Sequence, residues 1–223
     1  MIEVKNLVKS FKDGPLETRV LKGIDFTAAT GEFIAIMGRS GAGKSTLLYQ
    51  ISLLDEPTSG EIRINGRDTR AMSEREKMLF RLSEFGYVFQ DYALLPELTA
   101  LENVALPLYM QGASRAAADA KAVTALERVG LGKRLDNLPS QLSGGEQQRV
   151  SISRAIAHTP NVLFADEPTA NLDTESSATV MSIFKKLHED GQTIIMVTHE
   201  DDFLRFAERV VKLDDGKIVS DPR

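Results

Sequence analysis

A glycine-rich segment near the start of the chain combines the residue types and the spacing that bind phosphate. Residues 38–45 fit the pattern G-x-x-x-x-G-K-[ST] and lie between an apolar run at 33–37 and a helix-like run at 46–54. In this pattern the glycines let the backbone wrap phosphate groups, Lys44 meets the β and γ phosphates, and the Ser45 hydroxyl binds Mg²⁺. A plain glycine-rich turn would not need this order of strand, loop and helix, so the sequence predicts a nucleotide-binding site. The predicted phosphate-binding residues are Gly38, Arg39, Ser40, Gly41, Ala42, Gly43, Lys44, Ser45 and Thr46.

Two adjacent carboxylates follow a second apolar run. Residues 162–165 read Val-Leu-Phe-Ala and are followed by Asp166 and Glu167. Successive side chains of a strand point to opposite faces, so these two carboxylates can do two jobs. Asp166 suits the magnesium shell, and Glu167 suits a general base that orients or deprotonates an attacking water. The alternative is a turn at the strand end whose carboxylates are merely solvated.

A third segment, residues 142–149, combines a helix N-cap with two consecutive glycines. Ser143 is a good N-cap residue, and the free amides at the start of the helix offer a site for a second anion. A capped helix explains Ser143 but not Gly144 and Gly145, because glycine costs about 1 kcal/mol in a helix interior. The two glycines therefore indicate that this backbone closely approaches another group.

The elements that must position these residues follow a recognisable order. Short runs rich in valine, isoleucine and phenylalanine alternate with helical patterns, which is typical of a mostly parallel sheet covered by helices. Turn-rich residues separate the strands near the N-terminus and indicate a small antiparallel sheet. Between residues 91 and 158 the strand pattern stops, and helices are expected after the caps Thr99, Ser114 and Ser143. The expected core strands are 32–37, 85–90, 162–165 and 193–197, and the expected antiparallel strands are 2–11, 19–28 and 61–65.

The composition restricts the class of protein. The chain has 223 residues, of which 42% are hydrophobic and 26% charged, as in an ordinary globular protein. Its net charge of −5 argues against a nucleic-acid-binding domain, because such domains are typically basic. The lack of cysteine excludes disulfides and thiolate metal sites. No apolar run approaches the roughly 18 residues of a membrane-spanning helix, and the start lacks the pattern of a secretory signal.

Taken together, the motifs resemble those of the nucleotide-binding subunit of ABC transporters, over essentially the whole chain. The matching segments are GRSGAGKS, LSGGE and LFADEPTANLD, in the family's order. The resemblance implies an α/β fold: a P-loop NTPase (RecA-like) parallel-sheet core with an antiparallel β subdomain and an inserted α-helical signature subdomain. It also implies a single domain over residues 1–223, with ATP and Mg²⁺ as cofactors. The expected parts are an antiparallel lobe at 1–30 and 60–67, the core at 31–59, 68–90 and 159–223, and the helical subdomain at 91–158.

The same resemblance implies that a second copy of the chain completes each ATP site. In the family, two subunits sandwich two ATP molecules, and each phosphate loop faces the signature residues of the other subunit. The signature residues of this chain are Ser143, Gly144, Gly145 and Glu146. Glu146 stands where many relatives have glutamine, a common variant that implies no loss of activity. Asp173 resembles the D-loop residue that helps to couple the two sites.

Three further positions match the family one by one. Gln90 resembles the glutamine that touches the magnesium site and links it to the membrane partner, and a buried glutamine with an ordinary partner is the alternative. His199 resembles the switch histidine that contacts the γ-phosphate. Phe11 stands where the family has an aromatic residue, usually tyrosine, stacked on adenine, and an ordinary core phenylalanine is the alternative.

Three other segments resemble one group within the family. QDYALLPELTALENVALPL, ANLD and DGPLETRVLKG are similar to the LolD, MacB and FtsE ATPases of lipoprotein release, macrolide export and cell division. This implies a permease partner of the MacB, LolCE or FtsX type and a place on the cytoplasmic face of the inner membrane. Leu94 and Leu95 suit a groove that receives a short helix of the permease, and packing within the protein is the alternative. A regulatory ATP clamp of the cell-division type and a soluble, non-transporting ABC ATPase stay open as other functions.

Overall fold

A computed structural model describes residues 1–14 and 16–222 of the chain. The chain forms two compact units, the first from residues 1–81 and 192–222 and the second from residues 82–191. The second unit takes in the segments 82–90 and 159–191 as well as the expected helical region. Within the described residues, no helix is both long and apolar enough to cross a membrane.

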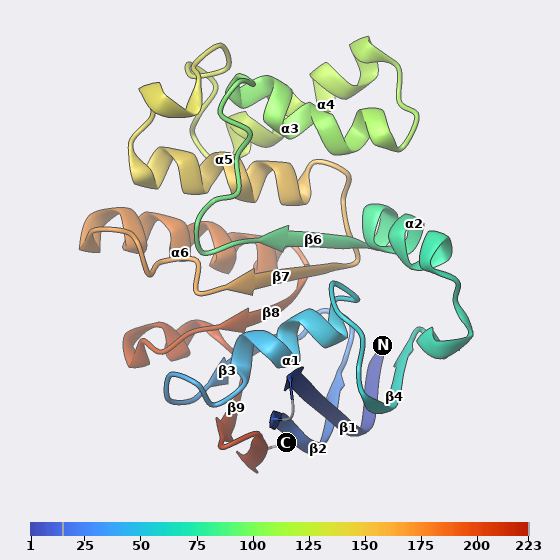
Figure 1. The fold of residues 1–223 in the computed structure, drawn as a ribbon. Helices are drawn as coiled ribbons and strands as arrows, with labels where there is room; N and C mark the ends of the chain where they lie inside the picture. The colour runs from blue at the N-terminus through green and yellow to red at the C-terminus, as the bar shows by residue number, and fades with distance from the viewer. Residues whose placement is uncertain (15, 223) are drawn as a thin grey trace. The chain divides into compact units, whose positions relative to one another are not determined.

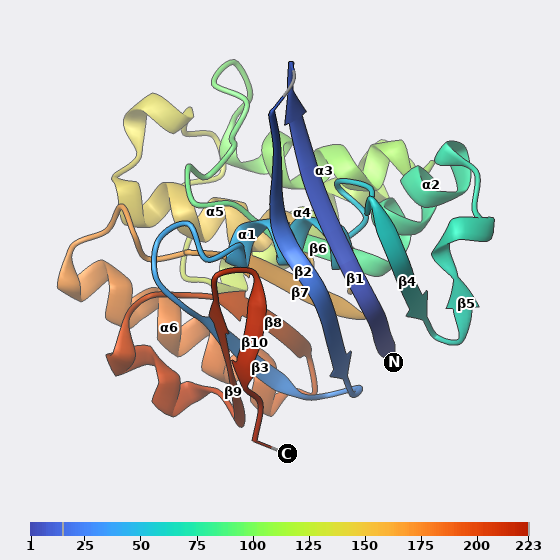
Figure 2. The ribbon, with the colours of Figure 1, turned by 60° about the horizontal axis from the view of Figure 1, so that its bottom comes forward.

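The first unit contains an antiparallel sheet with the strand order β2-β1-β4-β5 (Figure 2). The long β1 (Ile2–Asp13) pairs with β2 (Leu16–Ala28) on one side and with β4 (Ser59–Ile64) on the other. The short β5 (Arg67–Asp68) pairs with β4. Alternate apolar residues of these strands are buried, as a sheet with one core face requires. The three expected antiparallel strands are confirmed, and the first two are longer than expected.

Four further strands of the first unit have the order β10-β9-β3-β8. The central strand β3 (Phe33–Met37) is parallel to both β8 (Thr193–Val197) and β9 (Arg209–Asp214), and β10 (Lys217–Ser220) returns antiparallel to β9. β3 and β8 are buried along nearly their whole length, which explains their continuous apolar sequences. Helix α1 (Lys44–Ile51) follows β3. The strands β9 and β10 were not predicted from the sequence.

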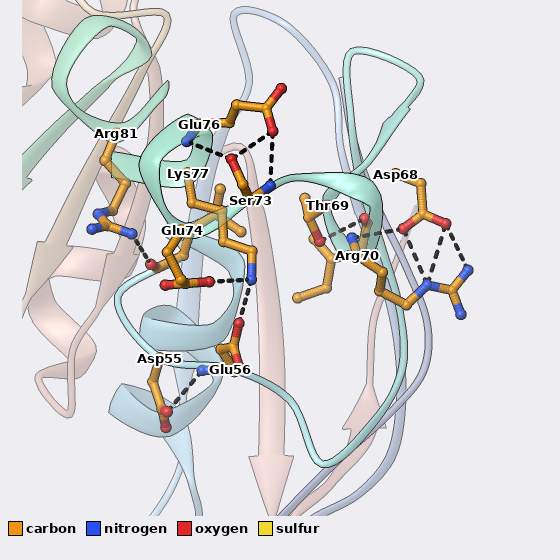
Figure 3. A network of polar contacts seen from close by, with 12 residues as sticks. Asp55, Glu56, Asp68, Thr69, Arg70, Ser73, Glu74, Glu76, Lys77 and Arg81 are labelled. Carbon is orange, nitrogen blue, oxygen red and sulfur yellow. Dashed lines mark hydrogen bonds and ion pairs between the residues drawn. The ribbon is translucent and has the colours of Figure 1, made fainter. Parts of the chain in front are cut away.

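Polar contacts anchor helix α2 (Glu74–Glu84), each residue of which keeps some solvent exposure. The amide and hydroxyl of Ser73 donate to the Glu76 carboxylate at 2.8 and 2.7 Å and cap the helix start (Figure 3). Further along, Lys77 donates to Glu56, and this hydrogen bond raises the pKa of Lys77 above its usual value. The cap therefore fixes the start of α2, and the bond from Lys77 to Glu56 holds the helix to the segment that follows α1.

The second unit combines a parallel strand pair with helices (Figure 1). In the strand pair, β6 (Phe85–Val88) lies beside β7 (Val162–Asp166). The helices are α3 (Ala100–Met110), α4 (Arg115–Arg128), α5 (Gly144–Ile156) and α6 (Thr174–Glu189). Helices α3, α4 and α5 pack on one another, and α5 also contacts β6. The expected caps are confirmed, because Thr99, Ser114 and Ser143 each accept from an amide three residues on.

Candidate functional site

The phosphate loop connects β3 to α1 in the first unit. Gly41 and Gly43 have φ angles of +78° and +98°, a conformation that side chains disfavour, and Gly43 is the N-cap residue of α1. A Cβ atom added at Gly38 would lie 2.2 Å from the carbonyl oxygen of Leu213. All three glycines are therefore needed for the backbone path of the loop itself.

Lys44 lies at the start of α1 and points back into this loop. Its side chain is 6% exposed, and Nζ donates to the carbonyl oxygens of Gly38 and Arg39 at 3.0 and 3.2 Å. The first turn of α1 carries no acidic residue. A buried ammonium and the positive end of a helix therefore meet at one place, which is the arrangement that stabilises a phosphate. Ser45 and Thr46, half-buried, follow on the same turn.

Phe11 and His199 also belong to the first unit. Phe11 lies on β1 opposite Thr18 and is 48% exposed, so it is not a core residue. Lys9 Nζ lies 5.0 Å from the centroid of the Phe11 ring. This contact places a cation against the π face of an exposed aromatic side chain. His199 is exposed and lies two residues beyond the end of β8.

The carboxylates Asp166 and Glu167 occupy different environments in the second unit. Asp166 ends β7 and is 5% exposed, whereas Glu167 is half-buried. Glu167 has a φ angle of +44°, and its carbonyl accepts from the Ala170 amide at 3.1 Å. A left-handed conformation in a non-glycine residue costs free energy and persists where the surrounding structure imposes it. The chain thus turns sharply at the residue expected to act as the base.

Ser143 and Glu146 form a reciprocal cap at the start of α5. The Ser143 amide donates to Glu146 Oε2 at 2.9 Å, and the Glu146 amide donates to Ser143 Oγ at 3.2 Å. Arg134 Nε donates to the other carboxylate oxygen at 2.9 Å. The hydrogen bond from the Ser143 amide is the main reason that the pKa of Glu146 lies below its usual value. The glutamate at this signature position therefore belongs to the capping box, and the hydrogen bonds that it accepts favour its ionised form.

Both signature glycines lie close to side chains of the second unit, and at Gly145 this packing leaves no room for a side chain. A Cβ atom added at Gly145 would lie 2.6 Å from Ser176 Oγ, and one added at Gly144 would lie 2.9 Å from the Tyr92 hydroxyl. The close approach expected from the sequence is thus to residues of the same chain. The glycines alone do not require a bound anion.

The side chain of Asp173 and the backbone carbonyl of Gln90 both accept hydrogen bonds that fix nearby segments. Asp173 caps α6 and accepts from the amide and hydroxyl of Ser176 at 2.8 and 2.9 Å. These hydrogen bonds, the amide's first, lower the pKa of Asp173. Gln90 lies beyond β6 with an exposed side chain, and its carbonyl accepts from Asn171 Nδ2 at 3.0 Å. The alternative of a buried glutamine does not describe Gln90.

Two residues that were not predicted from the sequence, Gln148 and Asn171, join the segments that follow β6 and β7. Gln148 is fully buried on α5, and its Nε2 donates to the carbonyl oxygens of Pro168 and Phe89 at 2.7 and 3.4 Å. Asn171 makes the bond to Gln90 just described. The segments after β6 and after β7 are therefore fixed to each other. No local sequence pattern marks Gln148, because its partners Phe89 and Pro168 lie far from it along the chain.

The structure thus groups the predicted residues by unit. The phosphate loop, Phe11 and His199 belong to the first unit, and Gln90, Asp166, Glu167, Asp173 and residues 143–146 belong to the second. Among residues 1–14 and 16–222, no group of three or more histidine, aspartate or glutamate side chains could hold a metal ion.

The chain is similar to known ATP-binding proteins along its whole length. Residues 21–170 match the protein family described as ABC transporter. An uncharacterized ABC transporter ATP-binding protein of Methanocaldococcus jannaschii is 51% identical, and the match covers 98% of both chains. The macrolide export ATP-binding/permease protein MacB of Marinobacter nauticus is 46% identical over 99% of this chain, which spans 34% of that protein.

A solved structure has the same fold. It is the dimer of an ATP-binding cassette in a post-hydrolysis state, bound to ADP and Pi. The TM-score is 0.93 at 40% identity, and the match covers 100% of this chain and 98% of the other. The predicted α/β fold of a P-loop NTPase, with an antiparallel β subdomain and a helical subdomain, is confirmed.

Proposed function

The chain belongs to the ABC transporter family, and we propose that its ATP site is built around the phosphate loop of residues 38–45. It is an ATP-binding subunit and an ATPase. The observation that carries the proposal is the buried Lys44 ammonium, held inside the loop at the positive end of α1. This arrangement fits a triphosphate, because its charge is met by the ammonium, by backbone amides and by the helix dipole. Phe11, as an exposed ring, would stack on the base.

The residues present also suit Mg²⁺. The Ser45 hydroxyl, the Asp166 carboxylate and the Gln90 amide oxygen are hard oxygen ligands, the kind that Mg²⁺ prefers. A nucleotide-bound Mg²⁺ takes most of its ligands from phosphate and water, so it needs few protein oxygens. When bound, the ion neutralises charge that develops on the phosphates.

Glu167 is the proposed general base. Hydrolysis requires a water oxygen to bond to the γ-phosphorus while the bond to the β–γ bridging oxygen breaks, giving ADP and inorganic phosphate. Glu167 would orient this water and accept its proton, and His199 would contact the γ-phosphate. The turn imposed by the φ angle of +44° supports this role, since strained backbone of this kind clusters at functional sites.

The first proposed partner is a second copy of the chain. We place Ser143, Gly144, Gly145 and Glu146 of one copy against the phosphate loop of the other, with Asp173 coupling the two sites. Ser143 is exposed at the N-terminus of α5, where backbone amides are available to an anion. The dimeric state of the similar ATP-binding cassette supports this assembly.

The second proposed partner is a membrane permease of the MacB, LolCE or FtsX type, which would hold the chain at the cytoplasmic face of the inner membrane. MacB relatives combine ATP-binding and permease parts in one protein, and this chain spans 34% of such a relative. We propose that ATP binding and hydrolysis drive a conformational change of the permease in export, lipoprotein release or mechanotransmission. Leu94 and Leu95, half-buried and exposed respectively, are the proposed docking residues.

Titration of the chain with Mg-ATP tests the core of the proposal. The Lys44→Ala variant loses the buried ammonium, so its affinity should fall at least tenfold, whereas Lys133→Ala, at an exposed lysine distant in sequence, should bind as the unmodified chain does. Equal affinities of the two variants would contradict a phosphate site at Lys44.

A further inference from the structure

The hairpin of β9 and β10 touches both ends of the phosphate loop. Asp215 and Gly216 form its turn with φ angles of +41° and +74°, the pattern of a tight hairpin turn. The Gly216 amide donates to the carbonyl of Ala42 at 3.1 Å. At the other end of the loop, the Leu213 carbonyl lies where a side chain of Gly38 would be.

The turn is also fixed to β2 from behind. The Lys22 amide donates to the Gly216 carbonyl at 2.8 Å, and Lys22 Nζ pairs with Asp215 at 2.6 Å. A Cβ atom added at Gly216 would lie 2.1 Å from the Val20 carbonyl oxygen. The same oxygen would be 3.3 Å from a Cβ atom at Gly43, so β2 touches the loop as well. Three backbone segments therefore meet with no space for a side chain at Gly216.

This packing determines the direction of one loop amide. A trans peptide group is planar, so its carbonyl and its N–H point in opposite directions. The described residues contain no cis peptide bond. Because Gly216 holds the carbonyl of Ala42 on the side of the turn, the N–H of Gly43 must point away from the turn. An amide fixed before binding costs no reordering when an anion arrives.

We infer that Gly216 is a positioning residue of the ATP site, which holds the Ala42–Gly43 peptide in the orientation that receives phosphate. The inference rests on the proposed binding of ATP by residues 38–45. An alanine at Gly216 would push the turn away from β2 and lengthen the hydrogen bond to Ala42. The loop would then sample other orientations, and ATP would bind more weakly.

A second turn in the same unit provides a matched control. Asn65 and Gly66 form the turn between β4 and β5 with φ angles of +51° and +76°, and a Cβ atom at Gly66 would meet nothing within 4 Å. Gly216→Ala and Gly66→Ala thus share the conformational penalty of alanine at a positive φ, but only Gly216→Ala displaces backbone. Mg-ATP titration should show affinity lowered roughly tenfold in Gly216→Ala and unchanged within about twofold in Gly66→Ala.

Two further measurements test the role of this turn if Gly216→Ala folds poorly. Asp215→Val strains the same turn without a Cβ at Gly216, since β-branched residues disfavour positive φ, and Asn65→Val is its control. Without nucleotide, hydrogen exchange of the loop amides at residues 41–43 should accelerate in the turn variants at 215 and 216 and not in the controls. Equal exchange and equal ATP affinity in variants and controls would overturn the inference. If the unmodified chain bound no Mg-ATP, the proposed function itself would fail. If only the role of Gly216 is wrong, the unmodified chain still binds Mg-ATP and the variants bind it equally well.

Discussion

Arg209 forms a buried ion pair with Glu32, in which Nη1 donates to Oε1 at 2.7 Å. Arg209 is 8% exposed, and it also donates to Asp221 at 2.7 Å and to the carbonyl of Thr27 at 2.8 Å. One guanidinium thus joins the start of β9 to the end of β2, to the start of β3 and to the C-terminal residues. The planar, multiply donating group of arginine suits such a junction, whereas lysine does not.

The first prediction follows from this junction. Arg209→Met keeps the apolar stem but leaves two carboxylates without their cation, and breaking a buried pair in this way costs about 3 kcal/mol. Urea unfolding should show this loss in the free energy of unfolding. Arg205→Met is the control at a less buried arginine, and it should change stability by less than about 0.5 kcal/mol. A similar loss in both variants would show that the ion pairs of Arg209 contribute little.

The second prediction concerns the sign of two glycine substitutions in α5. Glycine to alanine stabilises a helix by about 1 kcal/mol unless the new methyl group clashes. Gly145→Ala should destabilise the protein, because its Cβ would lie 2.6 Å from Ser176 Oγ and 2.8 Å from Ser176 Cβ. Gly144→Ala should be neutral or stabilising, because its nearest neighbour is the hydroxyl at the far end of the Tyr92 side chain.

Thermal unfolding of the two glycine variants distinguishes packing from ligand binding as the reason for these residues. The added change Ser176→Gly should recover part of the stability of Gly145→Ala, since it removes both clashing atoms. If Gly145→Ala is as stable as Gly144→Ala, the backbone adjusts and packing is not the constraint.

The third prediction is a pH dependence from Glu146. Its pKa in the folded protein lies below the ordinary value of 4.5, chiefly because the Ser143 amide donates to it. A depressed folded pKa contributes stability that is present above the unfolded value and is lost as pH falls through the folded value. The stability difference between the unmodified chain and Glu146→Gln should therefore be constant above about pH 5.5 and shrink as the pH falls below 4.5. A difference that does not depend on pH would show that the charge of Glu146 is immaterial.

Much of the fold could be predicted because the buried strands have uniform apolar sequences. β3, β7 and β8 are buried on both faces, and such strands leave a continuous run of valine, isoleucine, leucine and phenylalanine in the sequence. The strands β9 and β10 were missed, although Asp215-Gly216 between two alternating runs is a strong hairpin signal. Helix α2 was missed because its sequence is largely polar and it is held by ion pairs rather than by burial.

The prediction of the candidate site came from short motifs. A motif reports residues that are close in sequence, such as Lys44 and the glycines of its loop. The hydrogen bonds of Gln148 to Pro168 and of Gly216 to Ala42 join residues far apart in the chain. No local pattern encodes such pairs, because tertiary packing brings them together. For the same reason the sequence predicted a close approach at the signature glycines but could not identify Ser176 as the residue next to Gly145.

The fourth prediction separates binding from hydrolysis. Glu167→Gln keeps the volume of the side chain and removes the base, so it should bind Mg-ATP with nearly unchanged affinity and hydrolyse it about 10² to 10⁴ times more slowly. The variant should then accumulate as a nucleotide-bound dimer, visible by size-exclusion chromatography with ATP. Glu175→Gln, at an exposed glutamate of α6, is the control and should keep normal turnover. Unchanged turnover in Glu167→Gln would exclude this residue as the base.

The last prediction tests the loop expected to contact the permease. The backbone of this loop is held by Asn103, which is fully buried: its Oδ1 accepts from the Leu95 amide at 2.8 Å, and its Nδ2 donates to the carbonyls of Leu95 and Leu98 at 3.1 and 2.9 Å. The Leu95 side chain is nevertheless 44% exposed. An apolar side chain displayed on a rigid backbone suits a docking surface, because binding then orders little.

Leu95→Glu should therefore abolish co-purification of the permease while the melting temperature stays within about 2 °C of the unmodified chain, since surface substitutions usually change stability by less than 0.5 kcal/mol. Leu94→Glu should weaken the same interaction but also lower the melting temperature, because Leu94 is half-buried. Val219→Glu is the control, since Val219 is 63% exposed on β10. If the permease still co-purifies with Leu95→Glu, its docking surface lies elsewhere. If the melting temperature falls by many degrees, Leu95 instead contributes to packing within the protein.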